Sequence, residues 1–209
     1  MAQMGRPRSF DRDQAIEQAL HLFWEHGYDA TSLSQLKAGL GGGISAPSFY
    51  AAFGSKDALF QECVQRYLAT FAQVTECLWD ENLPPRLSIE TALRQSASMQ
   101  CERGHPKGCM VALGVMSAPS PENARVTTAL TQSRLRTRAG IAACVQRGMA
   151  AGQLPTNAHA LATVFDSFLQ GISILARDGV GHEVIDAAIS HVMLSWDISA
   201  ATTAVSRGH

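Results

Sequence analysis

The stretch that decides the fold runs from Thr31 to Phe60, with the sequence TSLSQLKAGLGGGISAPSFYAAFGSKDALF. Leucines at helical spacing predict a first short helix, three glycines predict a sharp turn, and a second short helix and the start of a third follow. Two short helices joined this tightly bury too little surface to be stable alone, so neighbouring helices must hold them. The pattern predicts a helix-turn-helix unit that presents one face outward, and we interpret that face as DNA-binding.

The predicted contact residues lie at the beginnings of these helices. Thr31 is placed as the N-cap of the first short helix, with its hydroxyl at the surface. The second short helix is anchored by Ile44 and Phe49, and it begins with small side chains that allow its backbone to approach the major groove. These small residues are Ser45, Ala46, Pro47 and Ser48.

Lys56 lies in the first turn of the third helix, which Ser55 caps, and a helix dipole disfavours a cation at that end. A DNA phosphate held by the helix N-terminus and by Lys56 would resolve this conflict, and Tyr50 offers a phenolic hydroxyl on the same side. The alternative is that Lys56 is an ordinary solvated surface lysine.

A short basic arm precedes the first helix. Its arginines, Arg6 and Arg8, are predicted to reach a minor groove or to follow the phosphate backbone, and the alternative is a tail without such contacts. Asp11 then caps a helix that ends at Gly27 and whose apolar stripe braces the two short helices.

Several short motifs in this region share the pattern of a known family. They are Gly27-Tyr28, Thr31-Ser32, Ile44-Ser45, Phe49-Tyr50, Phe53-Gly54-Ser55-Lys56 and Leu59-Phe60. This pattern resembles the N-terminal DNA-binding domain of the TetR family of bacterial transcriptional regulators. The resemblance implies that the recognition helix lies within 44–50, which includes Phe49, and that Thr31, Tyr50 and Lys56 contact phosphates. It also implies a homodimer that binds a palindromic double-stranded DNA operator as a repressor and is released by a small-molecule effector.

The turn departs from the family pattern, which usually has a single glycine before the isoleucine. Here Gly41, Gly42 and Gly43 follow Leu40, so Gly42 and Gly43 resemble an insertion. Two extra residues either form a looser loop or tilt the recognition helix. A TetR-like module with altered DNA binding, acting through protein partners, is therefore an alternative function.

Composition limits the other possibilities. With 209 residues, 46% hydrophobic and 17% charged, the chain predicts a compact protein, and its net charge of −1 requires any DNA contact to come from a local patch. No apolar run is long enough for a signal peptide or a membrane span, which predicts a cytoplasmic protein without membrane contact. The common enzyme and zinc motifs are absent, so we expect no catalytic residue, cofactor or metal.

The whole chain predicts an all-α protein of about nine helices. We divide it into a basic arm (1–10), a helix-turn-helix DNA-binding domain (11–60), a helical effector-binding and dimerisation domain (61–198) and a tail (199–209). Apolar stripes predict one continuous helix over 56–79, a short helix that opens at Cys109, and further helices over about 87–102, 123–151, 158–177 and 182–197.

The last two helices are apolar on more than one face, which predicts a four-helix dimer interface made by two copies. The candidate interface residues are Leu161, Phe168, Ile172, Ile185, Ile189, Val192 and Trp196. Soft and apolar side chains are the candidates for an effector pocket, with plain core packing as the alternative for each. They are Tyr67, Phe71, Met99, Cys109, Met110, Met116, Phe165 and Phe168.

Cys109 begins a short helix after a loop that carries His105 and Lys107. A helix dipole and nearby cations would lower the pKa of its thiol, whereas burial would leave it inert. A thiol- or metal-responsive repressor that senses through Cys109, with Cys101 or His105, is thus a second way to release DNA. An enzyme using Cys109 and His105 is a further alternative, but nothing in the sequence orients the histidine.

Overall fold

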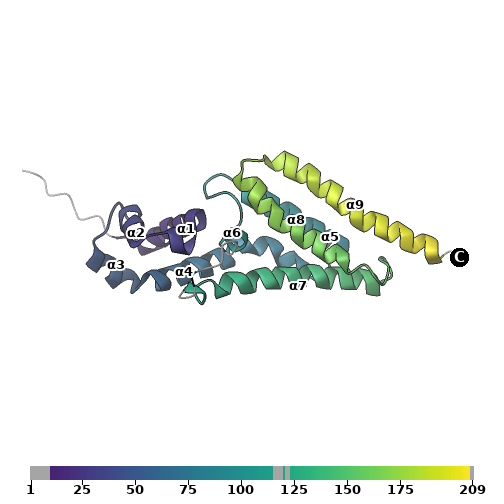
Figure 1. Cartoon of the computed structure of the whole chain (residues 1–209), viewed down its shortest axis with the longest axis horizontal. Helices are drawn as coiled ribbons and strands as arrows, with labels where there is room; N and C mark the ends of the chain where they lie inside the picture. The colour runs from purple at the N-terminus through teal and green to yellow at the C-terminus, as the bar shows by residue number, and fades with distance from the viewer. Residues whose placement is uncertain (1–9, 115–119, 121–122, 208–209) are drawn as a thin grey trace, which may run out of the picture.

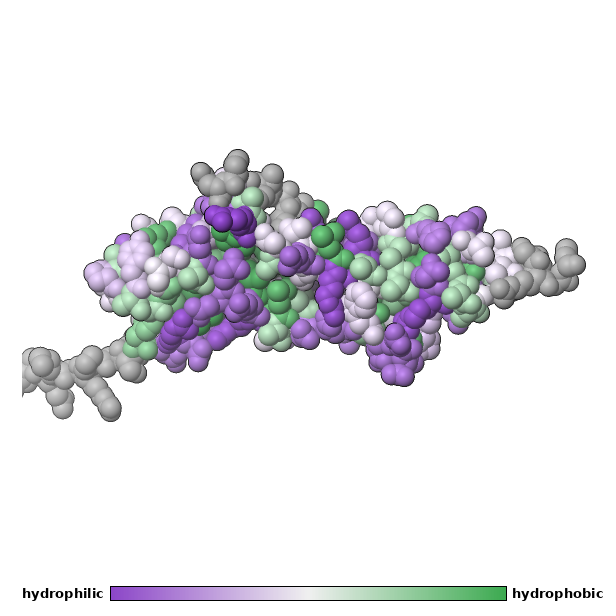
Figure 2. Space-filling view, turned by 90° about the horizontal axis from the view of Figure 1, so that it is seen from below, coloured by the Kyte–Doolittle hydropathy of each residue, from purple (hydrophilic) through white to green (hydrophobic). Residues whose placement is uncertain are grey.

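The computed structural model describes residues 10–114, 120 and 123–207, with side chains described as far as Thr203. Every secondary-structure element in these ranges is a helix. The molecule is elongated, with a head of short helices at one end and a body of long helices at the other (Figure 1). Hydrophilic and hydrophobic residues alternate in patches along the face seen in Figure 2, as expected where helices are half solvated.

The head consists of helices that lie close in sequence. They are α1 (Arg12–Ala30), α2 (Leu33–Gly39), α3 (Ala46–Phe53) and the first half of α4 (Lys56–Ala69). Asp11 caps α1 by accepting a hydrogen bond from the Gln14 amide at 3.0 Å, as the sequence predicted. Gly27, with φ of 79°, interrupts the helical backbone of α1 at the predicted end.

The predicted continuous helix over 56–79 is wrong. Helix α4 stops at Ala69, and a 3₁₀ helix, η1 (Phe71–Trp79), follows it. At the break the Thr70 hydroxyl donates to the Arg66 carbonyl at 2.7 Å, and the side-chain amide of Gln73 donates to the Leu68 carbonyl at 2.7 Å. These side chains satisfy carbonyls that a continued α-helix would have used, which is how polar side chains compete with the backbone ladder.

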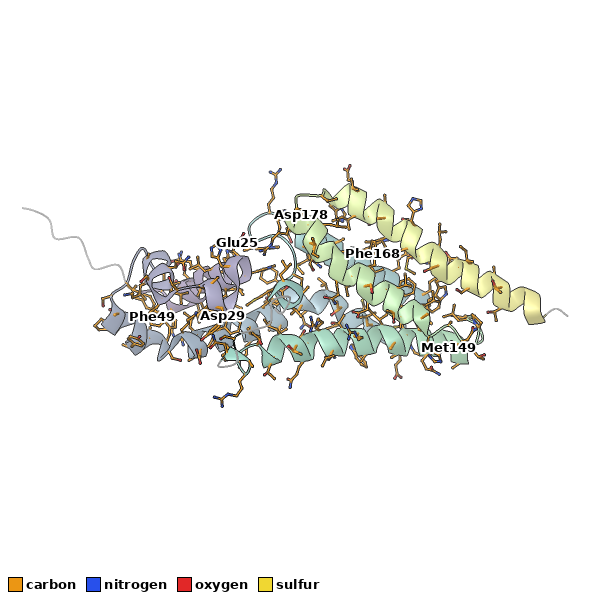
Figure 3. All side chains as sticks on the ribbon, in the orientation of Figure 1. Glu25, Asp29, Phe49, Met149, Phe168 and Asp178 are labelled. Carbon is orange, nitrogen blue, oxygen red and sulfur yellow. The ribbon has the colours of Figure 1, made fainter. Side chains whose placement is uncertain are left out.

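The body contains α5 (Pro85–Cys101), the short α6 (Met110–Leu113), α7 (Thr128–Ala150), α8 (Ala160–Arg177) and α9 (His182–Arg207). Two apolar cores are formed, one that extends from the head to α7 and one within the body. In Figure 3, Phe49 marks the head, Phe168 lies on α8 and Met149 lies near the far end of α7.

Two predicted boundaries differ from the structure. Helix α7 begins at Thr128 rather than at Asn123, and α9 continues to Arg207, so the expected tail from residue 199 is wrong. Within the added length of α9, side-chain hydroxyls donate to backbone carbonyls four residues earlier instead of competing with the helix. Ser199 donates to the Ser195 carbonyl at 2.8 Å, and Thr203 donates to the Ser199 carbonyl at 3.1 Å.

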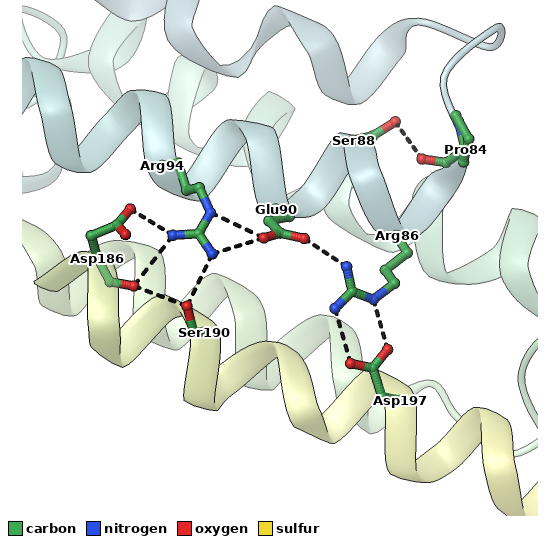
Figure 4. A network of polar contacts seen from close by, with 8 residues as sticks. All are labelled: Pro84, Arg86, Ser88, Glu90, Arg94, Asp186, Ser190 and Asp197. Carbon is green, nitrogen blue, oxygen red and sulfur yellow. Dashed lines mark hydrogen bonds and ion pairs between the residues drawn. The ribbon is translucent and has the colours of Figure 1, made fainter.

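An ion-pair network joins α5 to α9 (Figure 4). Arg86 donates to both carboxylate oxygens of Asp197, at 2.7 and 2.9 Å, and to Glu90 at 2.6 Å. Arg94 donates to Glu90 and, at 2.6 Å, to Asp186. The hydrogen bond from Arg86 lowers the pKa of the Asp197 carboxyl, against a smaller opposing effect of burial.

Because its pKa is depressed in the folded state, Asp197 stabilises the protein above the ordinary aspartate pKa of about 3.9, and this contribution is lost as the pH falls through the lower folded value. We expect Asp197→Asn to lower the free energy of unfolding by roughly 0.5–1 kcal/mol at pH 7. The difference from the wild type, measured by urea denaturation, should shrink progressively as the pH is lowered below about 3.9, and it should disappear only below the folded pKa of Asp197. Asp178→Asn, at an exposed carboxylate with no ion pair in the described chain, is the control; an equal loss there would contradict the prediction.

Candidate nucleic-acid interface

Helix α3 presents its first turn to solvent. The Ser45 hydroxyl caps the helix by accepting a hydrogen bond from the Ser48 amide at 3.2 Å, and the two hydroxyls lie 2.8 Å apart. Pro47 occupies the first turn, where it removes no hydrogen bond of the helix. Ser45, Pro47 and Ser48 are exposed and Ala46 is half-buried. The structure therefore gives α3 a small, polar leading edge.

The aromatic residues of α3 divide between surface and core. Tyr50 is 51% exposed, so its hydroxyl is available on the outer face. Phe49 is fully buried and its ring lies 5.4 Å from that of Phe53, which leaves it no access to DNA. Its inclusion among the DNA-binding candidates is wrong, because the helical period turns residue 49 toward the core while residue 50 faces outward.

The glycine turn is held by hydrogen bonds on both sides. The Ile44 amide donates to the Lys37 carbonyl at 2.9 Å, and the Gly41 amide donates to the Gln18 side chain on α1 at 2.8 Å. Gly42 and Gly43 have φ values of 81° and 103°, which side-chain-bearing residues rarely adopt. The inserted glycines thus form an ordered connection between α2 and α3.

This geometry predicts different effects of alanine and asparagine at position 42. Gly42→Ala should lower the free energy of unfolding by roughly 1–2 kcal/mol, since positive φ is strained for alanine although the space around Gly42 is open. Gly42→Asn should lower the free energy of unfolding by less, because asparagine tolerates this conformation. Chemical denaturation of the three proteins measures both effects, and equal stability of the alanine variant would show that the turn is not held at positive φ.

Thr31 does not cap α2 and its hydroxyl is not at the surface. The side chain is buried and donates to the Gly27 carbonyl at 2.7 Å, where it closes the end of α1. The N-cap is Ser32, which forms a reciprocal capping box with Gln35. The Ser-x-x-Gln spacing of this box is visible in the sequence, so Ser32 and Gln35 are exposed residues at a helix N-terminus that sequence reasoning missed.

Lys56 is only half exposed because its ammonium group lies 4.1 Å from the centroid of the Tyr28 ring. Burial lowers the pKa of Lys56, and the carboxylates of Asp29 and Asp57 oppose that shift. Tyr28 donates a hydrogen bond to Asp57. Ser55 caps α4 through the Ala58 amide at 3.0 Å, as the sequence predicted.

The basic arm lies at the edge of the described chain. Arg6 and Arg8 fall outside the described residues, so their predicted DNA contacts stay predictions. Arg12, the next basic residue, donates to Glu62 at 2.7 Å and to the Ala52 carbonyl at 3.3 Å. It ties the start of α1 to α3 and α4.

The candidate effector-binding residues do not line a single pocket. Tyr67, Met99 and Cys109 line a cavity of about 50 Å³ enclosed by the second half of α4, η1 and the body helices. Met110 and Phe165 are buried in the two cores, and Phe71 packs on Trp24 with ring centroids 5.0 Å apart. None of these three lines that cavity. Phe168 lies in an outer groove instead, and Met116 falls outside the described residues.

Of the two alternatives for Cys109, a thiol activated by the helix dipole and nearby cations or a buried inert thiol, the structure favours the buried thiol. Burial raises the pKa of this thiol, and a hydrogen bond donated by the Tyr67 hydroxyl at 3.2 Å opposes the shift only in part. Lys107 donates to the carbonyls of Cys101 and Glu102, and His105 stacks on Trp24 with ring centroids 4.6 Å apart. Lys107 and His105 are therefore engaged elsewhere.

Most candidate interface residues of α8 and α9 are core residues of the same protomer. Leu161, Ile172, Ile185, Ile189 and Trp196 are buried against α5 and α7 or between α8 and α9. Their assignment to a dimer surface is wrong, because these apolar side chains are buried in the core of their own protomer and cannot reach a second copy. Phe168 and Val192 instead line a groove of about 750 Å³, together with Ala160, Thr163, Val164, Ser167, Gly171 and Leu175.

Two further kinds of site are absent from the described ranges. None of the helices there has the length and apolar character needed to cross a bilayer. Nor do three or more histidine, cysteine or carboxylate side chains converge there to hold a metal ion.

Comparison with known proteins agrees with this geometry. Residues 15–63 match the model of the bacterial regulatory proteins of the tetR family. The chain is 30% identical over 198 residues to the HTH-type transcriptional repressor ComR of Escherichia coli (strain K12), covering 92% of this chain and 91% of ComR. It is 37% identical over 113 residues to the repressor BdcR of the same organism, covering 54% of this chain and 56% of BdcR.

A solved structure extends the similarity to the whole fold. It is a cysteine mutant of the TetR family regulator CifR in complex with a 26-base-pair operator DNA, with a TM-score of 0.78 and 33% identity. The match covers 91% of this chain and 100% of the CifR chain. Members of this family are DNA-binding regulators of transcription rather than enzymes. The chain belongs to the TetR family of bacterial transcriptional regulators.

Proposed function

We propose that the protein is a cytoplasmic homodimeric repressor that binds a palindromic operator and is released by a small-molecule effector. One observation supports the DNA-binding part of this proposal: the first turn of α3 is exposed and has small side chains, with Tyr50 beside it. A helix enters the major groove only where its leading side chains are small or make contacts themselves. The operator complex of the related CifR supports double-stranded DNA as the partner.

The proposed contacts with DNA come from helix N-termini and from a small number of charged side chains. Ser45, Ala46, Pro47 and Ser48 face the groove, and Tyr50 and Lys56 contact phosphates, as does the capped start of α2 at Ser32. Thr31 supports the site from the core by closing α1.

Removing either predicted phosphate contact should weaken operator binding. We expect Tyr50→Phe to raise the Kd for a duplex from the promoter region of its own gene roughly fivefold, the loss of one hydrogen bond. Lys56→Ala should in addition reduce the slope of log K against log salt by about one unit. Fluorescence anisotropy at several salt concentrations measures both.

Arg103→Ala is the matched control, since it removes an exposed cation on the loop after α5. Its salt slope should equal that of the wild type. Unchanged binding and salt dependence in the Lys56 variant, with thermal stability preserved, would refute the phosphate assignment.

The groove on α8 and α9 is the observation that supports the proposed dimer. Phe168, Gly171 and Val192 line it, and Val164 and Leu175 are 42% and 38% exposed along its length. An apolar groove of this kind on two neighbouring helices is suited to the same pair from a second copy, which would form a four-helix interface.

A charge in the groove should therefore break the dimer without unfolding the protomer. Val164→Glu is expected to raise the dimer Kd at least about tenfold, because a carboxylate would be buried against an apolar partner. Sedimentation equilibrium measures this change, and Leu135→Glu at an exposed position of α7 is the control. A wild-type protein that sediments as a monomer at micromolar concentration would contradict the proposal.

The cavity lined by Tyr67 is the observation that supports an effector. Its walls come from the second half of α4, η1, α5, α6, α7 and α8. Tyr67 packs against Trp24 on α1 with ring centroids 4.8 Å apart, so a ligand there would lie one side chain away from the head. Sensing through a covalently modified Cys109 is the second candidate, favoured by its presence in the cavity wall. We favour a non-covalent ligand because burial raises the pKa of that thiol and so depletes the thiolate.

A further inference from the structure

Two buried polar side chains line the cavity without a hydrogen-bonding partner. Gln100 on α5 is 2% exposed and Ser173 on α8 is 1% exposed, and both line the same cavity. The Gln100 Oε1 atom and the Ser173 hydroxyl make no hydrogen bond within the described chain. Buried polar groups are costly unless they are paired, so this pair marks a place for an occupant.

The backbone carbonyls of the same two residues lie next to Gly108. The Gly108 amide donates to the Gln100 carbonyl at 3.1 Å. Gly108 also lies against α8 so closely that an added Cβ would come within 2.7 Å of the Ser173 carbonyl oxygen. A change in the separation of α5 and α8 at the cavity must therefore move Gly108.

Gly108 in turn holds the head. Its carbonyl accepts a buried hydrogen bond of 3.1 Å from the indole of Trp24 on α1. Arg177, one turn beyond Ser173 on α8, donates to the carbonyls of Trp24 at 3.1 Å and Glu25 at 2.9 Å. The path from the cavity to α1 therefore consists of direct contacts at every step.

The chemistry of the pair limits what can bind. Gln100 Oε1 is an acceptor and needs a donor, whereas the Ser173 hydroxyl can donate. The other walls include Met99, Val111 and Leu169, and the charged Arg134 is partly exposed to solvent. A volume of about 50 Å³ gives room for roughly three to five water-sized groups, since one water molecule needs about 10–15 Å³ of such space.

We propose that the cavity binds a small neutral organic molecule with a hydroxyl group, which donates to Gln100 Oε1 and accepts from the Ser173 hydroxyl. Binding changes the separation of α5 and α8, displaces Gly108 and thereby moves Trp24 and the head. The regulatory meaning of this site rests on the proposed function, but the binding and the movement of Trp24 do not.

The test uses the full-length protein and two probes of equal size. 2-Propanol donates and accepts a hydrogen bond, whereas acetone only accepts. Each is titrated into ¹⁵N-labelled protein while the indole N–H signal of Trp24, assigned by Trp24→Phe, is followed by NMR. We expect 2-propanol to shift this signal and to bind at least about tenfold more tightly than acetone, as one buried hydrogen bond requires.

Gln100→Leu, which keeps the approximate size and removes the acceptor, should abolish that preference. Gln95→Leu, an exposed position on the same helix, should leave it unchanged. Equal binding of the two probes, or a preference that survives in Gln100→Leu, would overturn the assignment of the pair. The absence of binding by either probe would also overturn it, since water alone would then fill the cavity.

Operator binding in the presence of 2-propanol separates this inference from the proposed function. A shifted Trp24 signal with unchanged DNA affinity would uphold the site and refute its role in release. If the ligand-free wild type does not bind the operator at all, the proposed function is refuted but the ligand site is not. Binding of 2-propanol, measured on other signals, with an unmoved Trp24 would refute the path through Gly108.

Discussion

The buried hydrogen bond from the Trp24 indole to the Gly108 carbonyl fixes the head on the body. The bond is 3.1 Å long, and the Tyr67 and Phe71 rings surround the indole at centroid distances of 4.8 and 5.0 Å. In such apolar surroundings a hydrogen bond is strengthened, and leaving either group unpaired costs the full desolvation of that group. The orientation of α1, and with it the position of the whole head, depends on this contact.

The head and the body share one apolar core around that bond. Residues of α1 and α4 pack with Met99 on α5, Met110 and Val111 on α6 and Leu130 on α7. Tyr67 belongs to this core and also lines the cavity, where its hydroxyl accepts from the Met110 amide at 3.2 Å. Because protein interiors are close-packed, a displacement at the cavity wall is passed on to neighbouring helices rather than absorbed. A ligand site at this position is thus mechanically connected to the DNA-binding helices.

The charges of the protein serve mainly to hold the body together. Arg136 pairs with Glu76 at 2.9 Å and Arg138 pairs with Asp166 at 2.6 Å, as expected for an ion-paired surface of α7 rather than a second DNA site. Arg147 donates to three carbonyls at the turn after η1. With a net charge of −1, the proposed recognition of DNA relies on helix N-termini, small side chains and few cations, whose contributions depend on geometry.

The sequence by itself determined the features that depend on neighbours a few residues apart. The caps at Asp11, Ser45 and Ser55 are such features, and so are the family motifs and the helical class, because each follows from a short period or a local hydrogen bond. Only the tertiary structure decided which of two adjacent cap-forming residues, Thr31 or Ser32, faces the core.

Contacts between distant segments settled the rest. The apolar faces of α8 and α9 are alike in sequence, and packing against the other body helices determines which side is core and which side borders the groove. The ion pairs from α5 to α9 lie at the partly exposed edge of that contact. Gln100 and Ser173 carry no signal in the sequence, since a glutamine and a serine within helices are ordinarily solvated. They become a candidate site only because two helices far apart in the chain bury them together in the wall of one cavity, where an unpaired polar group has a large free-energy cost.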